Sequence, residues 1–578
     1  MTIRWTPVEG AAGYVVQRAD RREGPFQTID NGGGDVLAVP GPFYADTTGQ
    51  PGTVAWYAVA SLASADGAHG DLSEPVSAAS TTVAGTIDIR VDARDVVKPL
   101  AHPWHMVGAE HLSMLFYPKN DQGIDVGAEL AESLRIANLE LGMNRVRAHG
   151  ILLDDLGSYS ERDGEPFYDF AGVDRIYDKV ISLGLRPVVE LSFMPRALSA
   201  NPSATIFGYR GIVSPPKDYA RWGELIGALA RHLVARYGID EVAGWGFEVW
   251  NEPNLELFWT GSREDYFRLY DETAAALKRV DSRLKVGGPA TAAAAWIADF
   301  AAHVVGSGAP VDFLATHTYG NVPLDVATTA ARAGLEPCPV WWTEWGVSPR
   351  HFARINDSVL GAPFILHGMF SAMDRADYLA YWVISDHFEE LGTPPRFLHG
   401  GFGLLTVGNL RKPRFWALRM LEMLGAQRVA LTVAGDGAES MVEAIATRDP
   451  GGVIQVLVWN GTPDQTKQDG HPLLGRKIAL KIAGVSARRY RREHLRVDLE
   501  HSNLTQRWTA LGSPDWPDPD AWERLREGDS LEALEPAQTL EAGSGELSLG
   551  FHLPMPGVSL IRLRPAQDEH LFDISHSR

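Results

Sequence analysis

Residues 222–252, WGELIGALARHLVARYGIDEVAGWGFEVWNE, join a helix pattern to a short β-prone run. Apolar residues recur at the spacing i, i+3, i+4, i+7 and i+11, which places them on one stripe of a helix: Trp222, Leu225, Ile226, Leu229 and Leu233. The β-prone run at 244–252 follows and predicts a strand. The segment is therefore a helix followed by a strand, and the repetition of this unit along the chain decides the fold.

Short β-prone segments alternate with long amphipathic ones from about residue 100 to 425, which is typical of repeated βα units and a parallel sheet. Eight candidate strands are found, at 105–110, 145–150, 186–192, 244–252, 285–290, 313–320, 340–346 and 378–386. Eight strand–helix units of this total length predict a (β/α)8 TIM barrel. A doubly wound open sheet is the alternative, but the regular repeats and the lack of a glycine-rich phosphate loop count against it.

The sequence on both sides of the barrel region is rich in β signals. Residues 1–86 carry short β runs between Gly-Pro and Asp-Gly turns. Helical patterns stop near 426, and two β runs then flank a hairpin turn at 449–452. Residues 87–97 alternate like a strand of this later region. The predicted order is a small β-sandwich, the barrel, a second β-sandwich and a tail, at 1–86, 87–425, 426–566 and 567–578.

Composition excludes several classes of partner. The 578 residues include 53 basic and 73 acidic side chains, and the net charge of −20 disfavours binding to nucleic acid or anionic lipid. The single cysteine, Cys338, excludes an internal disulfide and a cysteine zinc cluster. Neither a leader-like apolar segment after Met1 nor the roughly 18 apolar residues of a spanning helix is found. We therefore expect a cytoplasmic protein without nucleic-acid or membrane partners.

Two glutamates close predicted barrel strands, Glu252 the fourth and Glu344 the seventh. Reacting groups of a TIM barrel lie at the C-terminal ends of its strands, and these two strands face each other across the mouth. A pair of carboxyl groups can protonate the oxygen that leaves an acetal and capture the cationic sugar carbon. For this, the environment must keep one carboxyl group protonated and the other ionised, so that their pKa values differ. A carboxyl separation of about 5 to 5.5 Å predicts retention of configuration, and about 6.5 to 9.5 Å predicts inversion.

Residues 247–255, FEVWNEPNL, followed by Phe258-Trp259, resemble the acid/base signature of glycoside hydrolase family 39, and specifically of its β-xylosidases. Further stretches that resemble the family occur in the same order along the chain, at 147–155, 285–290, 316–319, 385–390, 399–404 and 508–526. The resemblance covers about residues 100 to 565. It implies a retaining exo-glycosidase that removes terminal β-D-xylose from xylo-oligosaccharides by double displacement.

The resemblance also implies roles for individual residues. Glu252 is the expected general acid/base and Glu344 the expected nucleophile, with no metal and no cofactor. The remaining matched positions would surround the terminal sugar of a small oligosaccharide substrate. Asn251 is expected to bind the 2-hydroxyl, and His149, Glu389 and Glu390 the other hydroxyls. His317 and Tyr319 are expected to orient the nucleophile. Trp382 and Phe402 are expected to pack against the apolar faces of the sugar.

The N-terminal region resembles a different module. The order of Trp5-Thr-Pro, Gly13-Tyr14, Gly24-Pro25-Phe26 and Trp56-Tyr57 is similar to a fibronectin type III domain, beginning at its second strand. This resemblance implies an accessory or spacer role.

The sugar remains the open part of the interpretation. Residues 107–118, VGAEHLSMLFYP, differ from the glycine-rich, arginine-containing segment of the β-xylosidases. The same family contains α-L-iduronidases, which must bind a sugar carboxylate with cations. The segments 343–345 and 399–403 favour the xylosidase branch. A non-catalytic carbohydrate-binding protein is the alternative of another class, and a homo-oligomer is also open.

Overall fold

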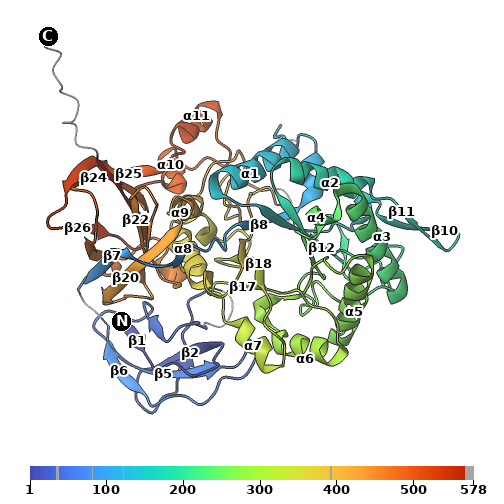
Figure 1. Ribbon diagram of the computed structural model, residues 1–578, viewed down its shortest axis with the longest axis horizontal. Helices are drawn as coiled ribbons and strands as arrows, with labels where there is room; N and C mark the ends of the chain where they lie inside the picture. Colours follow the sequence, from blue (N-terminus) through green and yellow to red (C-terminus); the bar gives the residue numbers. More distant parts are fainter. Residues whose placement is uncertain (34–37, 81–82, 121–122, 389, 391–393, 567–578) are drawn as a thin grey trace, which may run out of the picture.

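The protein has three parts: a small N-terminal β module, a barrel with its surrounding helices, and a C-terminal β lobe (Figure 1). The computed structural model describes residues 1–33, 38–80, 83–120, 123–388, 390 and 394–566. Within these residues, every helix is too short or too polar to cross a lipid bilayer.

Eight parallel strands close into a barrel in the order β12-β15-β16-β17-β18-β19-β8-β9, which confirms the predicted TIM barrel over the open sheet. They are β8 (Met106–His111), β9 (Arg145–His149), β12 (Arg186–Glu190), β15 (Gly246–Glu248), β16 (Val286–Thr291), β17 (Phe313–Tyr319), β18 (Val340–Gly346) and β19 (Tyr378–Tyr381). The fourth strand ends four residues earlier than predicted. Trp250 and Glu252 have φ of 71° and 43°, so the chain has left the extended conformation there.

Helices surround the barrel and bury their apolar stripes against it (Figure 1). They are α1 (Val126–Leu141), α2 (Ala171–Ser182), α3 (Tyr219–Tyr237), α4 (Ile239–Val242), α5 (Arg263–Val280), α6 (Ile297–Ser307), α7 (Val326–Arg332), α8 (Gly361–Ala372) and α9 (Pro413–Glu422). The predicted stripe of α3 is buried. Inside the barrel, a separate apolar cluster that includes Phe313 stacked on Trp341 fills the space below the site.

The C-terminal lobe is built on nine hydrogen-bonded strands in the order β25-β24-β27-β22-β21-β20-β7-β23-β26. They are β7 (Thr86–Pro99), β20 (Gln427–Gly435), β21 (Val442–Arg448), β22 (Ile454–Asn460), β23 (Arg476–Ala483), β24 (Arg489–Asp498), β25 (Glu532–Glu541), β26 (Glu546–Leu553) and β27 (Gly557–Pro565). The candidate strand before the barrel, β7, lies between β20 and β23, and Figure 1 shows it in blue beside the orange β20.

The expectation that helices stop near residue 426 is wrong. Two short helices, α10 (Leu504–Ala510) and α11 (Pro519–Glu527), stand between β24 and β25. Each begins at a side chain that accepts a hydrogen bond from the first turn, Asn503 and Asp518 respectively. The predicted tail at 567–578 lies outside the described residues.

The N-terminal module consists of two small sheets that enclose a core of their own. One pairs β1 (Thr2–Arg4) with β4 (Phe43–Ala45), and the other has the order β3-β2-β5-β6. The latter strands are β2 (Gly13–Ala19), β3 (Gln27–Thr28), β5 (Val54–Leu62) and β6 (Val76–Ala79). Side chains from both sheets meet in the core, among them Ile3, Tyr14, Val16, Tyr44 and Tyr57. The fibronectin type III resemblance stays a prediction.

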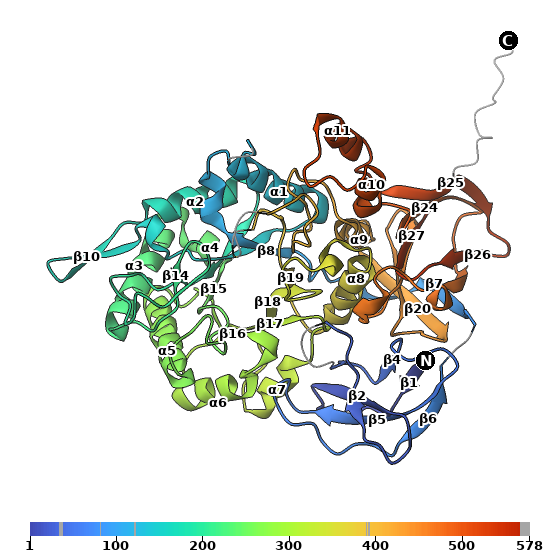
Figure 2. The ribbon, with the colours of Figure 1, turned by 180° about the vertical axis from the view of Figure 1, so that it is seen from behind.

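The module is docked on both other parts, beside α7 and the C-terminal lobe (Figure 2). The Asp325 amide donates to the Ala12 carbonyl at 3.0 Å, and the Thr47 and Thr462 hydroxyls lie 2.6 Å apart. Gly33 packs on Gly320, where a Cβ atom would lie 1.9 Å from the Gly33 carbonyl oxygen. Gly320 directly follows β17, so the module touches the barrel next to the end of a strand that carries site residues.

We expect Gly320→Ala to loosen this docking. Gly320 has φ of 72°, so alanine adds backbone strain of about 1–2 kcal/mol and also a steric clash with Gly33. Gly334→Ala is the matched control, because its φ is 91° but the nearest atom to the new Cβ lies at 3.8 Å. Gly320→Ala should lower the melting temperature further than Gly334→Ala and speed proteolytic release of the module. Equal effects of the two variants would contradict the role of the contact.

Candidate active site

Glu252 and Glu344 meet at the C-terminal mouth of the barrel. Glu252 follows β15 and Glu344 lies in β18, and both are buried. One carboxylate oxygen of each lies within 4.8 Å of the other and of a His317 ring nitrogen. The two glutamates therefore face one small volume, as the sequence analysis predicted from their strands.

The surroundings of Glu344 favour its ionised form. Arg147 donates to Oε2 at 2.9 Å, and the Tyr319 hydroxyl donates to Oε1. Burial alone raises the pKa of the Glu344 carboxyl, but the charges of His317 and Arg147 and the Tyr319 hydrogen bond outweigh it. The pKa of Glu344 is consequently lower than that of an ordinary glutamate.

The surroundings of Glu252 favour its protonated form. Burial raises the pKa of the Glu252 carboxyl, the hydrogen bond from His317 Nδ1 at 3.0 Å opposes this shift, and the Glu344 charge adds to it. The net direction is upward. The pKa of Glu252 is thus raised while that of Glu344 is lowered, which is the difference that acid–base chemistry on a shared substrate needs.

His317 links the pair to the interior of the barrel. Its Nδ1 lies 3.0 Å from Glu252 and 3.7 Å from Glu344, and its Nε2 lies 3.1 Å from the Thr343 hydroxyl. Burial lowers the pKa of His317, but the Glu344 charge and the hydrogen bonds to Glu248 and Glu252 raise it to about 9. A protonated ring at neutral pH donates from both nitrogens, which fixes its orientation.

Arg147 is the central group that the sequence analysis did not assign. Its fully buried guanidinium lies 2.7 Å from Glu190, 3.2 Å from Glu248 and 2.9 Å from Glu344. It also donates to the Asn251 side-chain oxygen at 2.7 Å. Burial raises the pKa of Glu248, but the Arg147 charge outweighs it and lowers this pKa to about 2. Strand alternation was the available signal, since Arg147 points to the same side of β9 as His149.

We expect Arg147→Met to destabilise the barrel strongly. The variant removes the guanidinium from the buried carboxylates Glu190 and Glu248, and the loss of one partner from such a buried ion pair costs about 3–5 kcal/mol of unfolding free energy. Arg236→Met, at an exposed pair with Asp178, should change stability far less. Chemical denaturation of the two variants measures the difference. Similar midpoints would show that the network does not hold the barrel together.

Three more predicted residues lie close to the groups that contact the glutamate pair. His149 Nδ1 lies 2.8 Å from Glu190, and its ring centroid is 4.7 Å from that of Trp382. The Trp382 ring also lies under the Arg147 guanidinium, at 5.3 Å. Phe402 belongs to the same apolar cluster as Trp382, with its ring 6.3 Å from that of Tyr319. All these side chains border the same site.

Glu390 belongs to the site as well, whereas Glu389 lies outside the described residues. Glu390 is 3.1 Å from His351 and 3.8 Å from His149. Burial raises the pKa of Glu390 to about 8, with a further contribution from Glu344 and an opposing one from His149. His351 was not predicted, because it lies outside every motif that the sequence analysis singled out.

The barrel, the paired glutamates and the ring of polar and aromatic side chains define a glycoside hydrolase site. The family model of glycosyl hydrolases family 39 matches residues 87–544. The chain belongs to this family and is an O-glycoside hydrolase. The match leaves out the N-terminal module.

Individual relatives agree with the family. The chain is 36% identical to a β-xylosidase from Caldicellulosiruptor saccharolyticus, over 65% of this chain and 79% of that protein. It is 34% identical to a β-xylosidase from Geobacillus stearothermophilus, over 77% and 91% respectively. Among solved structures, the family 39 enzyme from Xanthomonas axonopodis pv. citri has a TM-score of 0.73 at 29% identity, covering 84% of this chain and 98% of that one. The likeness to β-xylosidases supports exo action.

Proposed function

We propose that the protein removes terminal β-D-xylose from short xylo-oligosaccharides with retention of configuration. The observation that carries the proposal is the geometry of Glu252 and Glu344, with carboxylate oxygens within 4.8 Å and opposite pKa shifts. Retaining enzymes place their carboxyl groups about 5 to 5.5 Å apart, whereas inverting enzymes leave room for a water at about 6.5 to 9.5 Å.

In the first step, ionised Glu344 attacks the anomeric carbon and Glu252 gives its proton to the departing oxygen. A covalent glycosyl ester forms on Glu344 and the shortened sugar leaves. In the second step, Glu252, now ionised, takes a proton from water as the water oxygen bonds to the anomeric carbon. Glu344 is released as a carboxylate, and each step inverts the carbon, so the overall result is retention.

Asn251 is the proposed ligand of the sugar 2-hydroxyl. Arg147 donates to its side-chain oxygen at 2.7 Å, which fixes the amide plane. The amide nitrogen is buried and has no hydrogen-bond partner among the described residues. An oriented donor beside the nucleophile suits a hydroxyl whose hydrogen bonds strengthen at the transition state.

The charges of the site favour a neutral sugar over iduronate. A sugar carboxylate needs a free cation, but the Arg147 guanidinium is already shared among Glu190, Glu248 and Glu344. Glu390 lies 3.8 Å from His149, and its pKa of about 8 means that it would repel a sugar carboxylate only at alkaline pH. Together with the likeness to two β-xylosidases, this supports xylose as the sugar.

A panel of aryl glycosides tests the proposal: β-xyloside, α-arabinoside, β-galactoside and α-iduronide. We expect the highest kcat/KM on the β-xyloside, and β-xylose as the first product anomer in proton NMR. Preference for the iduronide would show that iduronate, and not xylose, is the terminal sugar. The appearance of α-xylose as the first product would show inversion of configuration and contradict the retaining mechanism. Hydrolysis of none of the four would favour the non-catalytic binding protein.

We expect Tyr319→Phe to move the acidic limb of the kcat/KM profile to higher pH. The Tyr319 hydroxyl stabilises ionised Glu344 and so lowers its pKa, and removing the donor raises that pKa. The alkaline limb, which reports loss of the Glu252 proton, should keep its position. Tyr237→Phe, at the last residue of α3 and hydrogen-bonded to Asp178 instead of a site residue, is the control. An unmoved acidic limb would contradict the hydrogen bond to the nucleophile.

A further inference from the structure

Two groups of side chains in the described part of the chain bring three possible metal ligands within 4.8 Å of one another. One group contains the two catalytic glutamates. The other, which we call the basal cluster, consists of His102, His105 and Glu422. Two imidazoles and a carboxylate are a ligand set that zinc takes in proteins, and the basal cluster has no part in the proposed reaction.

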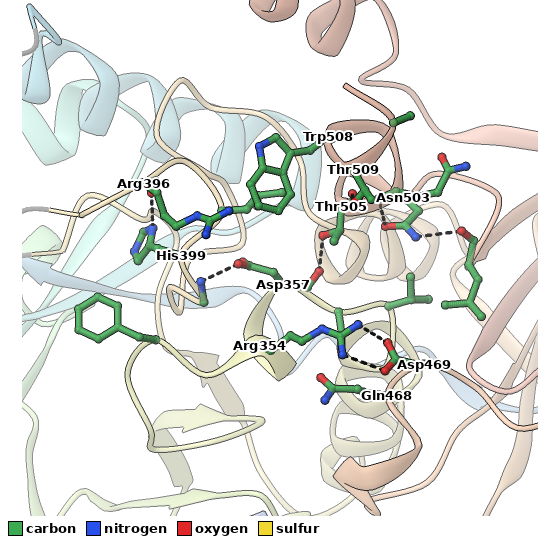
Figure 3. A pocket seen from close by; sticks show the side chains of 18 of the residues that line it. Arg354, Asp357, Arg396, His399, Gln468, Asp469, Asn503, Thr505, Trp508 and Thr509 are labelled. Atoms are coloured by element: carbon green, nitrogen blue, oxygen red, sulfur yellow. Dashed lines mark hydrogen bonds and ion pairs between the residues drawn. The ribbon is translucent and has the colours of Figure 1, made fainter. Parts of the chain in front are cut away.

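The large hollow between the barrel and the C-terminal lobe, of about 890 Å³, is a poorer place for a cation (Figure 3). Figure 3 shows that its Asp469 carboxylate is bound by the Arg354 guanidinium, at 2.9 Å for one of the two hydrogen bonds. The His399 Nδ1 atom lies 3.1 Å from the Arg396 carbonyl oxygen. A metal ion would have to displace these partners, whereas the basal cluster needs no such exchange of ion pairs.

The basal cluster lies at the end of the barrel opposite to the catalytic mouth. His102 and His105 directly precede β8, and Glu422 is the last residue of α9. The catalytic residues of a TIM barrel lie at the C-terminal ends of its strands, and the cluster lies at the N-terminal end of one. A metal ion bound there would therefore act on the stability of the barrel and not on the substrate.

The distances within the basal cluster suit a zinc ion. Zinc bonds to nitrogen and oxygen at about 2.0–2.2 Å, so two ligand atoms of a tetrahedral site lie about 3.3–3.5 Å apart. His105 Nε2 and Glu422 Oε2 are 3.1 Å apart. The His102 ring stacks on that of His105, with centroids 4.7 Å apart and planes at 26°. Only the partly exposed His102 side chain has to turn toward the ion, and solvent can supply a fourth ligand.

The neighbouring residues hold the carboxylate in place. The Trp104 indole N–H donates to Glu422 Oε2 at 2.9 Å, and a partner of this kind orients a metal ligand. Gly142, which follows α1, has φ of 64°. A Cβ atom at Gly142 would lie 2.6 Å from Glu422 Oε1 and 2.8 Å from His105 Nε2. The absence of a side chain at this position thus lets both ligand groups lie against the backbone.

The basal cluster also lies beside the seam at which the barrel closes. The register between β19 and β8 contains a single residue pair, Tyr381 with Val107, whereas that between β17 and β18 contains six. The segment that carries the two histidines takes part in this seam, because the Leu379 amide donates to the Pro103 carbonyl at 2.8 Å. An ion that joins this segment to α9 would tie the first barrel strand to the last barrel helix.

We propose that His102, His105 and Glu422 bind a zinc ion that stabilises the closure of the barrel. The inference is independent of the sugar on which the enzyme acts, because no residue of the cluster belongs to the active site. Zinc binding should raise the melting temperature, since a ligand that binds only the folded chain stabilises it. Turnover of an aryl β-xyloside should be the same with and without zinc.

Calorimetric titration of the chelator-treated, full-length protein with zinc chloride tests the proposal. We expect one zinc ion per chain with a Kd below about 10 µM, and a loss of affinity of about tenfold or more in His102→Ala. Glu422→Gln should weaken binding as well, while its amide oxygen still accepts from Trp104. His552→Ala, at an exposed position of β26, is the matched control and should bind zinc like the parent.

The catalytic group is the competing site, and Glu344→Gln distinguishes the two. Binding at the basal cluster should persist in Glu344→Gln, and zinc should raise the melting temperature of this variant but not that of His102→Ala. Three results would overturn the proposal: no zinc binding by the parent, parent-like binding by both His102→Ala and Glu422→Gln, or loss of binding in Glu344→Gln. An equal loss in His552→Ala would show adventitious binding by surface histidines and would also overturn it.

Discussion

Glu344→Gln is expected to hydrolyse an aryl β-xyloside at less than about one-thousandth of the parent rate. The amide cannot form the glycosyl ester, and a thousandfold loss corresponds to about 4 kcal/mol of barrier. Glutamine keeps one side-chain oxygen that can accept from Arg147, and its amide group can donate to the Tyr319 hydroxyl oxygen, so the fold should persist. Initial rates and the melting curve of the purified variant measure the two properties separately.

Glu256→Gln provides the matched control, since this glutamate is exposed on the loop that follows Glu252. It should hydrolyse the xyloside at the parent rate. If Glu344→Gln retained activity within about tenfold of the parent, a covalent intermediate on Glu344 would be untenable. A variant that melts far below the parent would instead show that the carboxylate is needed to balance Arg147.

The sequence predicted those features that depend on local patterns. The alternation of strands and helices identified all eight barrel strands, and the strand ends then placed Glu252 and Glu344 on one mouth. Closure of the barrel brings the C-terminal ends of its strands together, whatever their separation along the chain. Counting the strands was therefore sufficient to predict that the two glutamates meet. The roles of the two glutamates came from the family resemblance and are tested by the variants described here.

Features that depend on contacts across the barrel were not predictable in the same way. Arg147 bonds to carboxylates on three other strands, and only the closed fold shows that Glu190, Glu248 and Glu344 share one cation. The Gly33–Gly320 contact likewise joins the N-terminal module to the barrel. Docking of one part on another produces no periodic pattern in the sequence from which it could be predicted. Helices α10 and α11 were missed because each is shorter than the window in which an apolar stripe can be counted.

Glu252→Ala is expected to lose activity to an extent that depends on the leaving group. A xylo-oligosaccharide leaves as a poor alkoxide and needs the Glu252 proton, so its hydrolysis should fall by about 10² to 10⁴-fold. An aryl xyloside with an acidic phenol needs no such proton and should still form the ester on Glu344. Its turnover is then limited by the second step, in which no base activates water. Steady-state rates on both substrates measure this contrast.

Rescue by azide distinguishes the loss of the acid/base group Glu252 from general damage to the site. With the Glu252 carboxylate gone, the anion can enter the space beside His317 and attack the anomeric carbon without a base. A nitrogen–carbon bond forms as Glu344 leaves, and the product is β-xylosyl azide with retained configuration. Azide should therefore raise the aryl xyloside rate of Glu252→Ala and leave that of Glu344→Gln unchanged. Rescue in neither variant, together with equal losses on both substrates, would remove Glu252 from proton transfer.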